Sequence, residues 1–498
     1  MAAEVYTSLI PLYAVVVSLV AVPLILVSAR IANLREFWTI AASCVKFLFV
    51  LSLVPDALAG RIAATTLIEI SPGINLALKA DPLGVFFGLL ASGLWVFTSF
   101  YSIGYVRGLH EQKQTRYFAS FAVCLSATIG IAFSANLLTF LVFYEVLTIA
   151  TYPLVIHKET PEAISAGRKY LAYTLTAGVI LIATTGWTYR LAGSTDFVAG
   201  GLLNDSMASG AEMLLLFFLF LAGVGVKAAI MPLHGWLPTA MAAPTPVSAL
   251  LHAVAVVKSG VFGVMRVVGF VFGPGVMQSF DLNDILLVLA GVTILLASFL
   301  ALREDNLKRR LAYSTVGHLS YIVLGAALLS PVSFGGGMLH IATHATMKIT
   351  LFFCAGAIYV AHHKENVSDL DGIGKAMPWT MGAFTVGALG LAGIPPVNGF
   401  VSKWLLGAGA VDAQSTASLA ILLVSGLLNA GYFFPIILRA FFRESHEFEK
   451  YQEASPMMVV PIVATAVLSV LFGLWPNLLV NFYDISVIVA TSVFGGVQ

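Results

Sequence analysis

Charged residues are scarce in this chain of 498 residues. They make up 10% of it, whereas hydrophobic residues make up 59%. A soluble globular chain typically has about 25% charged residues. The composition therefore excludes an ordinary soluble protein and leaves no stretch for a separate soluble domain. The formal net charge of +1 gives no reason to expect nucleic acid or an acidic substrate as a partner.

Cysteine is also scarce. Cys44, Cys124 and Cys354 all lie in apolar runs, and none of them belongs to a CxxC motif. This usage excludes a disulfide framework, an iron–sulfur cluster and a thiolate zinc site. We therefore expect neither a metal nor a cofactor.

Long apolar runs are what the chain has in abundance. A helix needs about 20 apolar residues to cross a bilayer, and the first such run is too long to be the core of a signal peptide. The pattern predicts an all-α polytopic membrane protein with about 14 transmembrane helices. The predicted spans are 8–29, 36–56, 82–105, 117–135, 136–157, 169–192, 211–231, 246–270, 283–302, 310–330, 336–361, 380–407, 415–441 and 457–481.

The lysines and arginines between these spans are distributed unevenly. With the N-terminus outside, most of them fall in loops on one side, and the opposite side holds Arg61, Lys79, Arg190 and Arg266. Loops rich in lysine and arginine stay in the cytoplasm. The sequence therefore predicts a multi-pass protein of a cytoplasmic membrane with both termini outside.

Prolines interrupt two of the spans. A proline removes a backbone donor and clashes with the preceding turn, so we expect the seventh helix to break near Pro232 and Pro238. The twelfth helix is expected to break at Pro395 and Pro396. In lipid, irregular backbone persists only where protein covers it or where it lines a water-filled cavity.

The two breaks lie five spans apart, which is typical of inverted repeats with binding sites near the membrane midplane. We therefore expect two inverted five-helix repeats. The predicted units are 1–116 with three helices, 117–270 with helices four to eight, 283–443 with helices nine to thirteen, and 457–498 with the fourteenth helix.

Few ionisable residues lie inside the spans, and such residues are costly there and usually functional. Glu145 is the only acidic residue deep within one, and Lys227 is its obvious partner two helices later. Lys258 and Lys403 lie beside or beyond the breaks. This set indicates an ion path. Snorkelling lysines and a static ion pair between helices are the alternatives, although a buried pair stabilises a fold only weakly.

Histidines extend this set. His340, His344 and Lys348 are spaced four apart and therefore share one face of the eleventh helix, and His252 and His318 lie on the eighth and tenth. A single buried histidine is more often a packing residue, but three titratable groups on one face favour a relay. Burial lowers the pKa of lysine toward neutrality, and histidine titrates near pH 6.5, so both types suit proton transfer.

Five stretches carry a family resemblance: YEVLTIATYPL around Glu145, KAAIMPLHGWLPTAMAAPTPVSALLHAVAVVKSG, NLKRRLAYSTVGHLSYI, HATMKITLFFCAGAIY and GIPPVNGFVSKW. They resemble the antiporter-like subunits shared by respiratory complex I, group 4 membrane-bound hydrogenases and Mrp cation/proton antiporters. The match runs from about residue 81 to 403. Within the family the chain is most similar to the MrpD subunit of the Mrp antiporters, and Lys403 favours MrpD over complex I members that carry glutamate there.

The resemblance implies roles for individual residues. Glu145 would face a neighbouring subunit and pair with Lys227, Lys258 would be the central relay, and Lys403 the terminal proton carrier. It also implies a bacterial or archaeal inner membrane, other membrane subunits as partners, and H+ with Na+ or K+ as the transported ions.

Three functional hypotheses follow. The first is a proton-translocating subunit of a multisubunit Na+ or K+/H+ antiporter, a transporter subunit without an enzymatic site of its own. The second is the same kind of subunit in a proton-pumping redox complex, either complex I or a membrane-bound hydrogenase. A non-conducting scaffold is the third, and the full set of buried ionisable residues argues against it.

Overall fold

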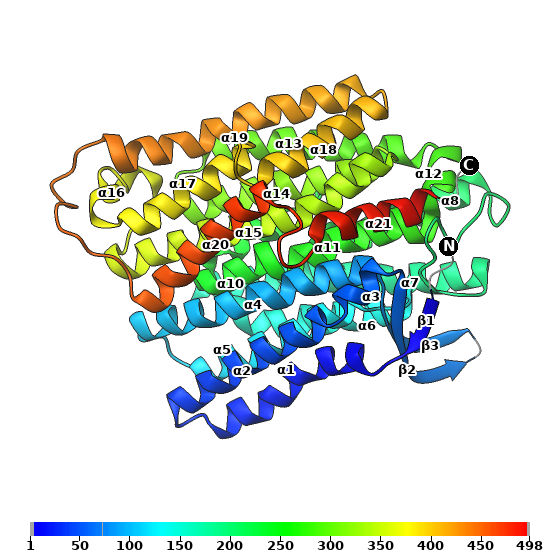
Figure 1. The fold of residues 1–498 in the computed structure, drawn as a ribbon, viewed down its shortest axis with the longest axis horizontal. Helices are drawn as coiled ribbons and strands as arrows, with labels where there is room; N and C mark the ends of the chain where they lie inside the picture. Colours follow the sequence, from blue (N-terminus) through cyan, green and yellow to red (C-terminus); the bar gives the residue numbers. More distant parts are fainter. Residues whose placement is uncertain (1–3, 72, 496–498) are drawn as a thin grey trace.

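A computed structural model describes residues 4–71 and 73–495. This part of the chain forms one bundle of long helices that run side by side, with a small sheet at one end (Figure 1). In it, twelve helical runs are long and apolar enough to cross a membrane. The predicted helical multi-pass fold is confirmed. The two predicted spans outside that set, 310–330 and 380–407, correspond to α14 and to the broken pair α17–α18.

The first half of the chain carries the N-terminal helices and the first broken helix. Polar caps start several of these helices: Asp81, Asn136, Thr160 and Ser209 each accept a backbone N–H of the following turn. The elements are α1 (Ile10–Val27), α2 (Ala32–Leu51), α3 (Val54–Leu58), α4 (Pro82–Gly108), α5 (Gln114–Ala132), α6 (Leu137–Val155), α7 (Pro161–Ala192), α8 (Gly210–Lys227), α9 (Trp236–Thr239), η1 (Ala240–Ala242), α10 (Thr245–Ala249), the π-helical turn η2 (Leu250–Val254), α11 (Val256–Arg266), the π-helical turn η3 (Val267–Phe272) and α12 (Gly273–Ser279).

The second half repeats the pattern of long helices around one broken pair. Its last predicted span, 457–481, ends earlier than expected, and a further short helix follows it. The elements are α13 (Leu282–Arg303), α14 (Leu307–Ala327), α15 (Pro331–His362), η4 (Val367–Asp369), α16 (Ile373–Ala376), α17 (Pro378–Ala392), α18 (Gly399–Asp412), α19 (Thr416–Phe442), α20 (Pro456–Leu474) and α21 (Phe482–Phe494).

Three strands form a sheet that the sequence pattern did not predict. They are β1 (Glu4–Thr7), β2 (Arg61–Ser71) and β3 (Ile74–Ala80), in the order β1-β2-β3. β1 runs parallel to β2 with Glu4 opposite Arg61, and β2 runs antiparallel to β3. β2 is rich in isoleucine and threonine, which favour strands. Its pairing with β1 joins segments far apart in the chain, which a local pattern does not reveal.

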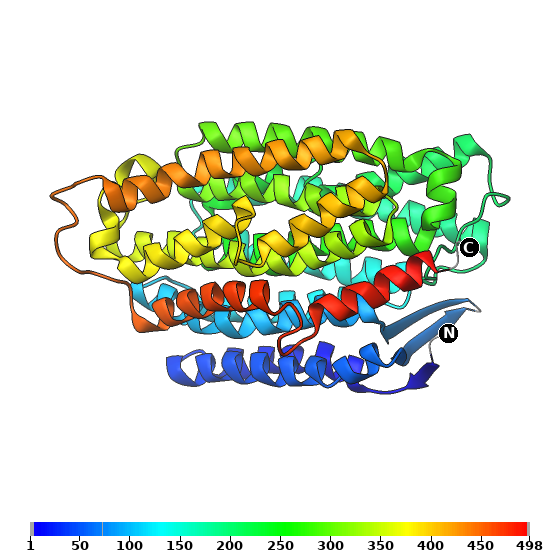
Figure 2. The same cartoon turned by 45° about the horizontal axis from the view of Figure 1, so that its top comes forward.

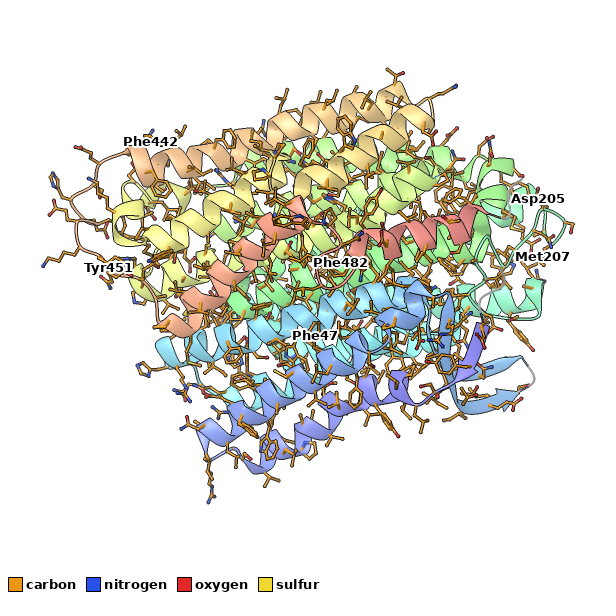
Figure 3. All side chains as sticks on the ribbon, viewed as in Figure 1. Phe47, Asp205, Met207, Phe442, Tyr451 and Phe482 are labelled. Carbon is orange, nitrogen blue, oxygen red and sulfur yellow. The ribbon has the colours of Figure 1, made fainter. Side chains whose placement is uncertain are left out.

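The two ends of the bundle differ. Both termini and the sheet lie at one end, and the α19–α20 loop lies at the other with α16 (Figure 1). Figure 3 shows Phe442 and Tyr451 at that second end, opposite Asp205 and Met207. The α4–α5 and α6–α7 loops, joined by the ion pair between Lys113 and Glu159, lie there too. We call this the basic end, because the loops found above to be rich in lysine and arginine lie here.

Two helical runs lie at the centre of the molecule. A stretch of 18 residues in the run Thr245–Ser279 and one in helix α15 are entirely buried inside the protein, whereas only one-third of the corresponding stretches of α1, α19 and α20 is buried. α15 packs against α14, α17, α18, α20 and α21, while α1 and α2 form an outer layer (Figure 2). The central runs carry His252, Lys258, His340, His344 and Lys348. Most of the predicted ionisable residues therefore lie on helices that protein, not lipid, surrounds.

Candidate proton path

Both predicted helix breaks are present. At each break, other protein groups form hydrogen bonds with backbone N–H or carbonyl groups that have left the helix. α8 ends at Lys227, and Pro232 stands in the loop that follows. There the Trp236 indole N–H donates to the Val226 carbonyl at 2.8 Å, and the Met231 N–H donates to the Thr293 hydroxyl at 3.1 Å. Pro238 lies inside the short α9, not in the loop itself.

In the second break, Pro395 and Pro396 separate α17 from α18. Gly393 ends α17 with a φ of +92°, in the left-handed region that favours glycine. The Asn398 N–H donates to the Ser469 carbonyl on α20 at 2.9 Å. The irregular backbone is thus bonded to a neighbouring helix, as a membrane requires.

Lys227 is held by Tyr144 and not by the expected carboxylate. Its ammonium donates to the Tyr144 carbonyl at 2.6 Å and lies 3.4 Å from the centre of the Tyr144 ring. The Glu145 carboxylate and the Lys227 ammonium form no direct ion pair, although the two charges lie close enough to interact electrostatically. Among the residues that the structure describes, Glu145 Oε1 has no hydrogen-bond partner. The contact implied by the resemblance is absent here because Glu145, the next residue on α6, points to a different side of the helix from the Tyr144 ring.

Glu145 instead points toward α7 and the flank of the bundle. Gly178 on α7 abuts its carboxylate so closely that a Cβ there would collide with it. The residue is half-buried, and apolar side chains around it are exposed, such as Ile149 at 64% and Val179 at 66%. Glu145 therefore stands at the edge of an apolar surface, while Lys227 is fully buried.

Lys258 is bonded to one histidine of α15. Its ammonium lies 2.7 Å from His344 Nδ1. The His344 ring contacts the His318 ring on α14, with centroids 5.3 Å apart. His318 Nδ1 in turn lies 3.1 Å from His340 Nε2. The tertiary structure thus joins Lys258 to three histidines from two helices.

Asn429 on α19 connects this cluster to Lys403. Its amide nitrogen lies 3.4 Å from His318 Nε2 and 3.2 Å from the Leu391 carbonyl. The Lys403 ammonium donates to the same carbonyl at 2.6 Å. Leu391 is in the last turn of α17, where the helix dipole favours a cation. A cavity of about 540 Å³ opens beside Lys403 and Tyr321.

A branch of the same network reaches Lys348. The Tyr432 hydroxyl donates to Asn429 Oδ1 at 2.5 Å and lies 2.9 Å from the Ser314 hydroxyl. The Lys348 ammonium donates to that serine at 2.9 Å. Lys348 therefore connects to Lys403 through α14 and α19.

His252 stands apart from this network. It lies in the π-helical turn η2, and its ring stands 4.7 Å from the Phe352 ring. Neither of its nitrogens bonds to a protein group in the described part of the chain. No group of three or more His, Cys, Asp or Glu side chains within residues 4–71 and 73–495 is placed to hold a metal ion.

The sequence pattern did not single out the neutral members of this network: Asn429, Tyr432, Ser314, Ser402 and Tyr321. Ser402 lies 2.9 Å from His340 Nδ1, and the Tyr321 ring lies beneath the Lys403 ammonium. Asn429 alone offered a signal, as an asparagine inside an apolar span. Serines and tyrosines are common in spans, so only contact reveals their role.

Comparison with known proteins places the chain in a family. The family model described as NADH:quinone oxidoreductase/Mrp antiporter, TM matches residues 134–429, more than half of the sequence. The chain belongs to this family. It is an antiporter-like membrane protein, and the matched region holds each charged residue of the network described above.

Relatives and a solved structure agree with this assignment. The chain is 33% identical to NADH-quinone oxidoreductase subunit N of Desulforudis audaxviator, over 75% of this chain and 74% of the relative. It is 30% identical to a probable K(+)/H(+) antiporter protein of Rhizobium meliloti, over 80% of this chain but 42% of that longer protein. In fold it matches a chain of the Mrp complex from a Dietzia species, with a TM-score of 0.87 at 21% identity and 98% coverage of both chains.

Proposed function

We propose that this family member is a proton-translocating membrane subunit of a multisubunit Na+ or K+/H+ antiporter. Protons would move along Glu145, Lys227, Lys258, His344 with Lys348, and Lys403, and their inward flow would drive cation export elsewhere in the assembly. The observation that carries the proposal is the connected row from Lys258 to Lys403. Its hydrogen bonds and ring contacts join titratable groups on the buried central helices to Lys403 on α18, through Asn429 on the one-third buried α19.

Proton transfer requires groups that can both accept and release a proton within hydrogen-bond reach. Neutral histidine meets this requirement, because one ring nitrogen accepts while the other donates. Asn429 and Tyr432 hold the neighbouring groups in place. The lysines at either end of the row can carry the proton as a charge. Structural ion pairs alone would not require three neighbouring histidines.

We base the assignment to a particular subunit on the antiporter relatives. The MrpD subunit of an Mrp-type complex fits the fold match and the presence of Lys403. Partners would then be other membrane subunits of the same complex, and Glu145, at its apolar surface, would face one of them. The basic end would face the cytoplasm of a bacterial or archaeal cell, with both termini outside.

The two broken helices support a further organisation. The pairs α8–α9 and α17–α18 both break at prolines, and each lies next to a lysine, the buried Lys227 and the partly buried Lys403. Residues 117–270 and 283–443 would be inverted repeats around the shared row, with 1–116 and 457–498 added at the ends.

A redox-driven complex is the second candidate, because the relative with 33% identity is a subunit of NADH-quinone oxidoreductase. The same row would then move protons outward, driven by electron transfer in other subunits. Isolation of the native complex with identification of its subunits separates the two candidates. Redox-centre subunits would support the second candidate, and small membrane subunits alone would support the first.

The test of proton translocation uses the intact complex in membrane vesicles. Lys227→Ala and Lys403→Ala are expected to abolish cation-induced pH changes. Lys375→Ala, an exposed lysine on α16, serves as the control and should leave them intact. Full exchange by both variants in assembled complexes would defeat the proposal.

A further inference from the structure

A third helix break, between α20 and α21, lies outside the proton path described above. α20 ends at Leu474 and α21 begins at Phe482, and Pro476 stands in the segment between them. The side-chain amide of Asn477 donates to Asp484 Oδ1 at 2.8 Å, and the Asp484 N–H donates to Asn477 Oδ1 at 3.1 Å. These two hydrogen bonds join the break to the first turn of α21.

This third break lies at the depth of the buried row. Gly473, in the last turn of α20, packs so closely on the second break that a Cβ there would collide with the Pro396 carbonyl. Phe482 and Thr343 line the same small cavity, and Thr343 is next to His344 on α15. Figure 3 shows Phe482 near the middle of the bundle, between its two ends. The apolar interior of a bilayer would therefore surround the protein at this depth.

The second and third breaks expose different kinds of side chain. In the second break the polar residue Asn398 is buried, and the exposed residues, such as Ile394 and Pro395, are apolar. In the third break the polar residues Asn477 and Asp484 are themselves exposed. A carboxylate and an amide thus lie on the outer flank of the bundle, at a depth where a chain without partners would meet lipid tails.

The flank around these two side chains is otherwise apolar. Trp475 is 58% exposed and Leu479 is 75% exposed. α20 packs on α4, α15 and α17, and α21 packs on α4 and α15, while their other side lies at the front of Figure 1 with no helix over it. Aromatic and apolar side chains around a few polar groups are typical of the centre of a protein–protein interface.

Lipid tails cannot bond the polar groups of this break. A charged side chain within the apolar layer is costly and normally pairs with another group, and irregular backbone there needs protein or water around it. Within residues 4–71 and 73–495, the aspartates that form ion pairs are Asp56, Asp81 and Asp371, so Asp484 has no cation there. An ionised carboxylate only accepts hydrogen bonds, and the missing partner must therefore be a donor.

We propose that the exposed side of α20 and α21 at this break is an interface with another membrane subunit, one of whose spanning helices places a lysine or arginine opposite Asp484. The cation completes the carboxylate, and apolar side chains of the same helix cover Trp475 and Leu479. This interface is separate from the one proposed at Glu145, which points toward α7. The inference requires only the membrane-spanning fold and does not depend on whether the row moves protons.

Depth and charge favour this partner over two others. The polar head groups of a bilayer lie about 15 Å from its midplane, since the apolar layer is about 30 Å thick, so a lipid amine does not reach Asp484. A second copy of this chain on a two-fold axis would present the same patch to itself, and two Asp484 carboxylates would then repel each other. A spanning helix with a basic residue has neither problem.

The first test maps the contact in the native complex. The photoreactive residue p-benzoyl-phenylalanine replaces Leu479, and the isolated complex is irradiated and digested. We expect a cross-link to a spanning helix of another subunit that carries a lysine or arginine. The same residue in place of Val20, which is 54% exposed on the outer helix α1, controls for cross-linking to lipid. Lipid adducts alone at position 479, a cross-link to a second copy of this chain, or one to a helix without a basic residue overturns the proposal.

The second test changes the charge. Asp484→Lys is expected to lower recovery of the cross-linked subunit with the purified chain at least fivefold, because two cations then meet. Aspartate in place of the partner's basic residue should restore the recovery. Asp484→Asn keeps an acceptor for the Asn477 amide but loses the charge, so it should cause a smaller loss. Glu444→Lys, exposed in the α19–α20 loop, is the control and should leave recovery unchanged.

These measurements can fail independently of the proposed function. Unchanged recovery with Asp484→Lys overturns the interface, at equal amounts of the chain in the membrane. A loss that the exchanged partner residue does not restore means that Asp484 only holds the break together, and it overturns the interface as well. Full cation exchange by Lys227→Ala and Lys403→Ala, beside the expected cross-link at position 479, removes the proposed function and leaves the interface in place.

Discussion

The regions around Lys227 and Lys258 hold a buried lysine in two different ways. Lys227 rests on a backbone carbonyl and an aromatic face, and its expected carboxylate points elsewhere. Lys258 bonds a histidine that contacts two more. The Lys227 region stabilises a cation in one position, whereas the Lys258 region provides a series of groups that can accept a proton.

This difference indicates different tasks for the Lys227 region and the Lys258 region. In the Lys258 region a proton can pass between groups that already touch. In the Lys227 region, transfer to Glu145 needs a side-chain movement or intervening water. Under the proposed function, the Lys227 region therefore suits a step that depends on movement, and the Lys258 region suits conduction.

The largest expected effect comes from removing the start of the conducting region. Lys258→Met should lower cation-driven exchange by about 100-fold or more, the usual contribution of a positioned proton-transfer group. Lys46→Met is the matched control. Lys46 is equally buried, but it donates only to the Ala14 carbonyl on α1, far from the row in the fold. If both variants lose exchange equally, the loss of any buried lysine impairs exchange, and the Lys258 region does not differ from other buried sites.

Asn429→Leu tests whether neutral groups hold the conducting region together. The variant loses the contacts to His318 and to the carbonyl that Lys403 shares. Exchange should fall about tenfold, since a neutral hydrogen bond contributes about 0.5–1.5 kcal/mol and the variant loses both of these contacts. Vesicle assays at equal amounts of assembled complex measure it, with Asn283→Leu, at the partly exposed start of α13, as control. An unchanged rate would show that the histidines reach Lys403 without Asn429.

Substitutions of Tyr144 test how the Lys227 ammonium is held. Tyr144→Leu removes the ring under the ammonium, and exchange should fall about fivefold, in line with a cation–π energy of roughly 1 kcal/mol. Tyr144→Phe keeps the ring and loses only the 3.3 Å hydrogen bond to the Gly223 carbonyl, so its rate should stay near that of the unaltered protein. If Tyr144→Phe is as slow as Tyr144→Leu, the hydroxyl and not the ring holds Lys227.

Gly178→Ala should have the smallest effect, about twofold on exchange. The new methyl group meets the flexible end of Glu145, which can move aside for less than the ~1–3 kcal/mol of an overpacked rigid core. Gly186→Ala on the same helix meets nothing within 4 Å and should be silent. If Gly178→Ala also leaves the rate of exchange unchanged, the position of Glu145 does not limit that rate.

The sequence predicted the helical membrane fold and both proline breaks because lipid imposes these features locally. A span must be about 20 apolar residues long, and a proline removes a backbone donor from the helix in which it stands. The four-residue spacing of His340, His344 and Lys348 likewise predicted a shared face, since one helix determines it. The pairing of β1 with β2 was missed because α1, α2 and α3 separate the two strands along the chain.

Sequence alone determined which residues of this protein are ionisable, which of them lie in spans, and where the helices break, since each depends on neighbours along the chain. Only the tertiary structure decided their partners. It left Glu145 and Lys227 without a direct ion pair, and it joined Lys258 to His344 across 86 residues and Asn429 to His318 across 111. The physical reason is that packing of distant helices, which no local pattern encodes, decides which side chains can exchange a proton.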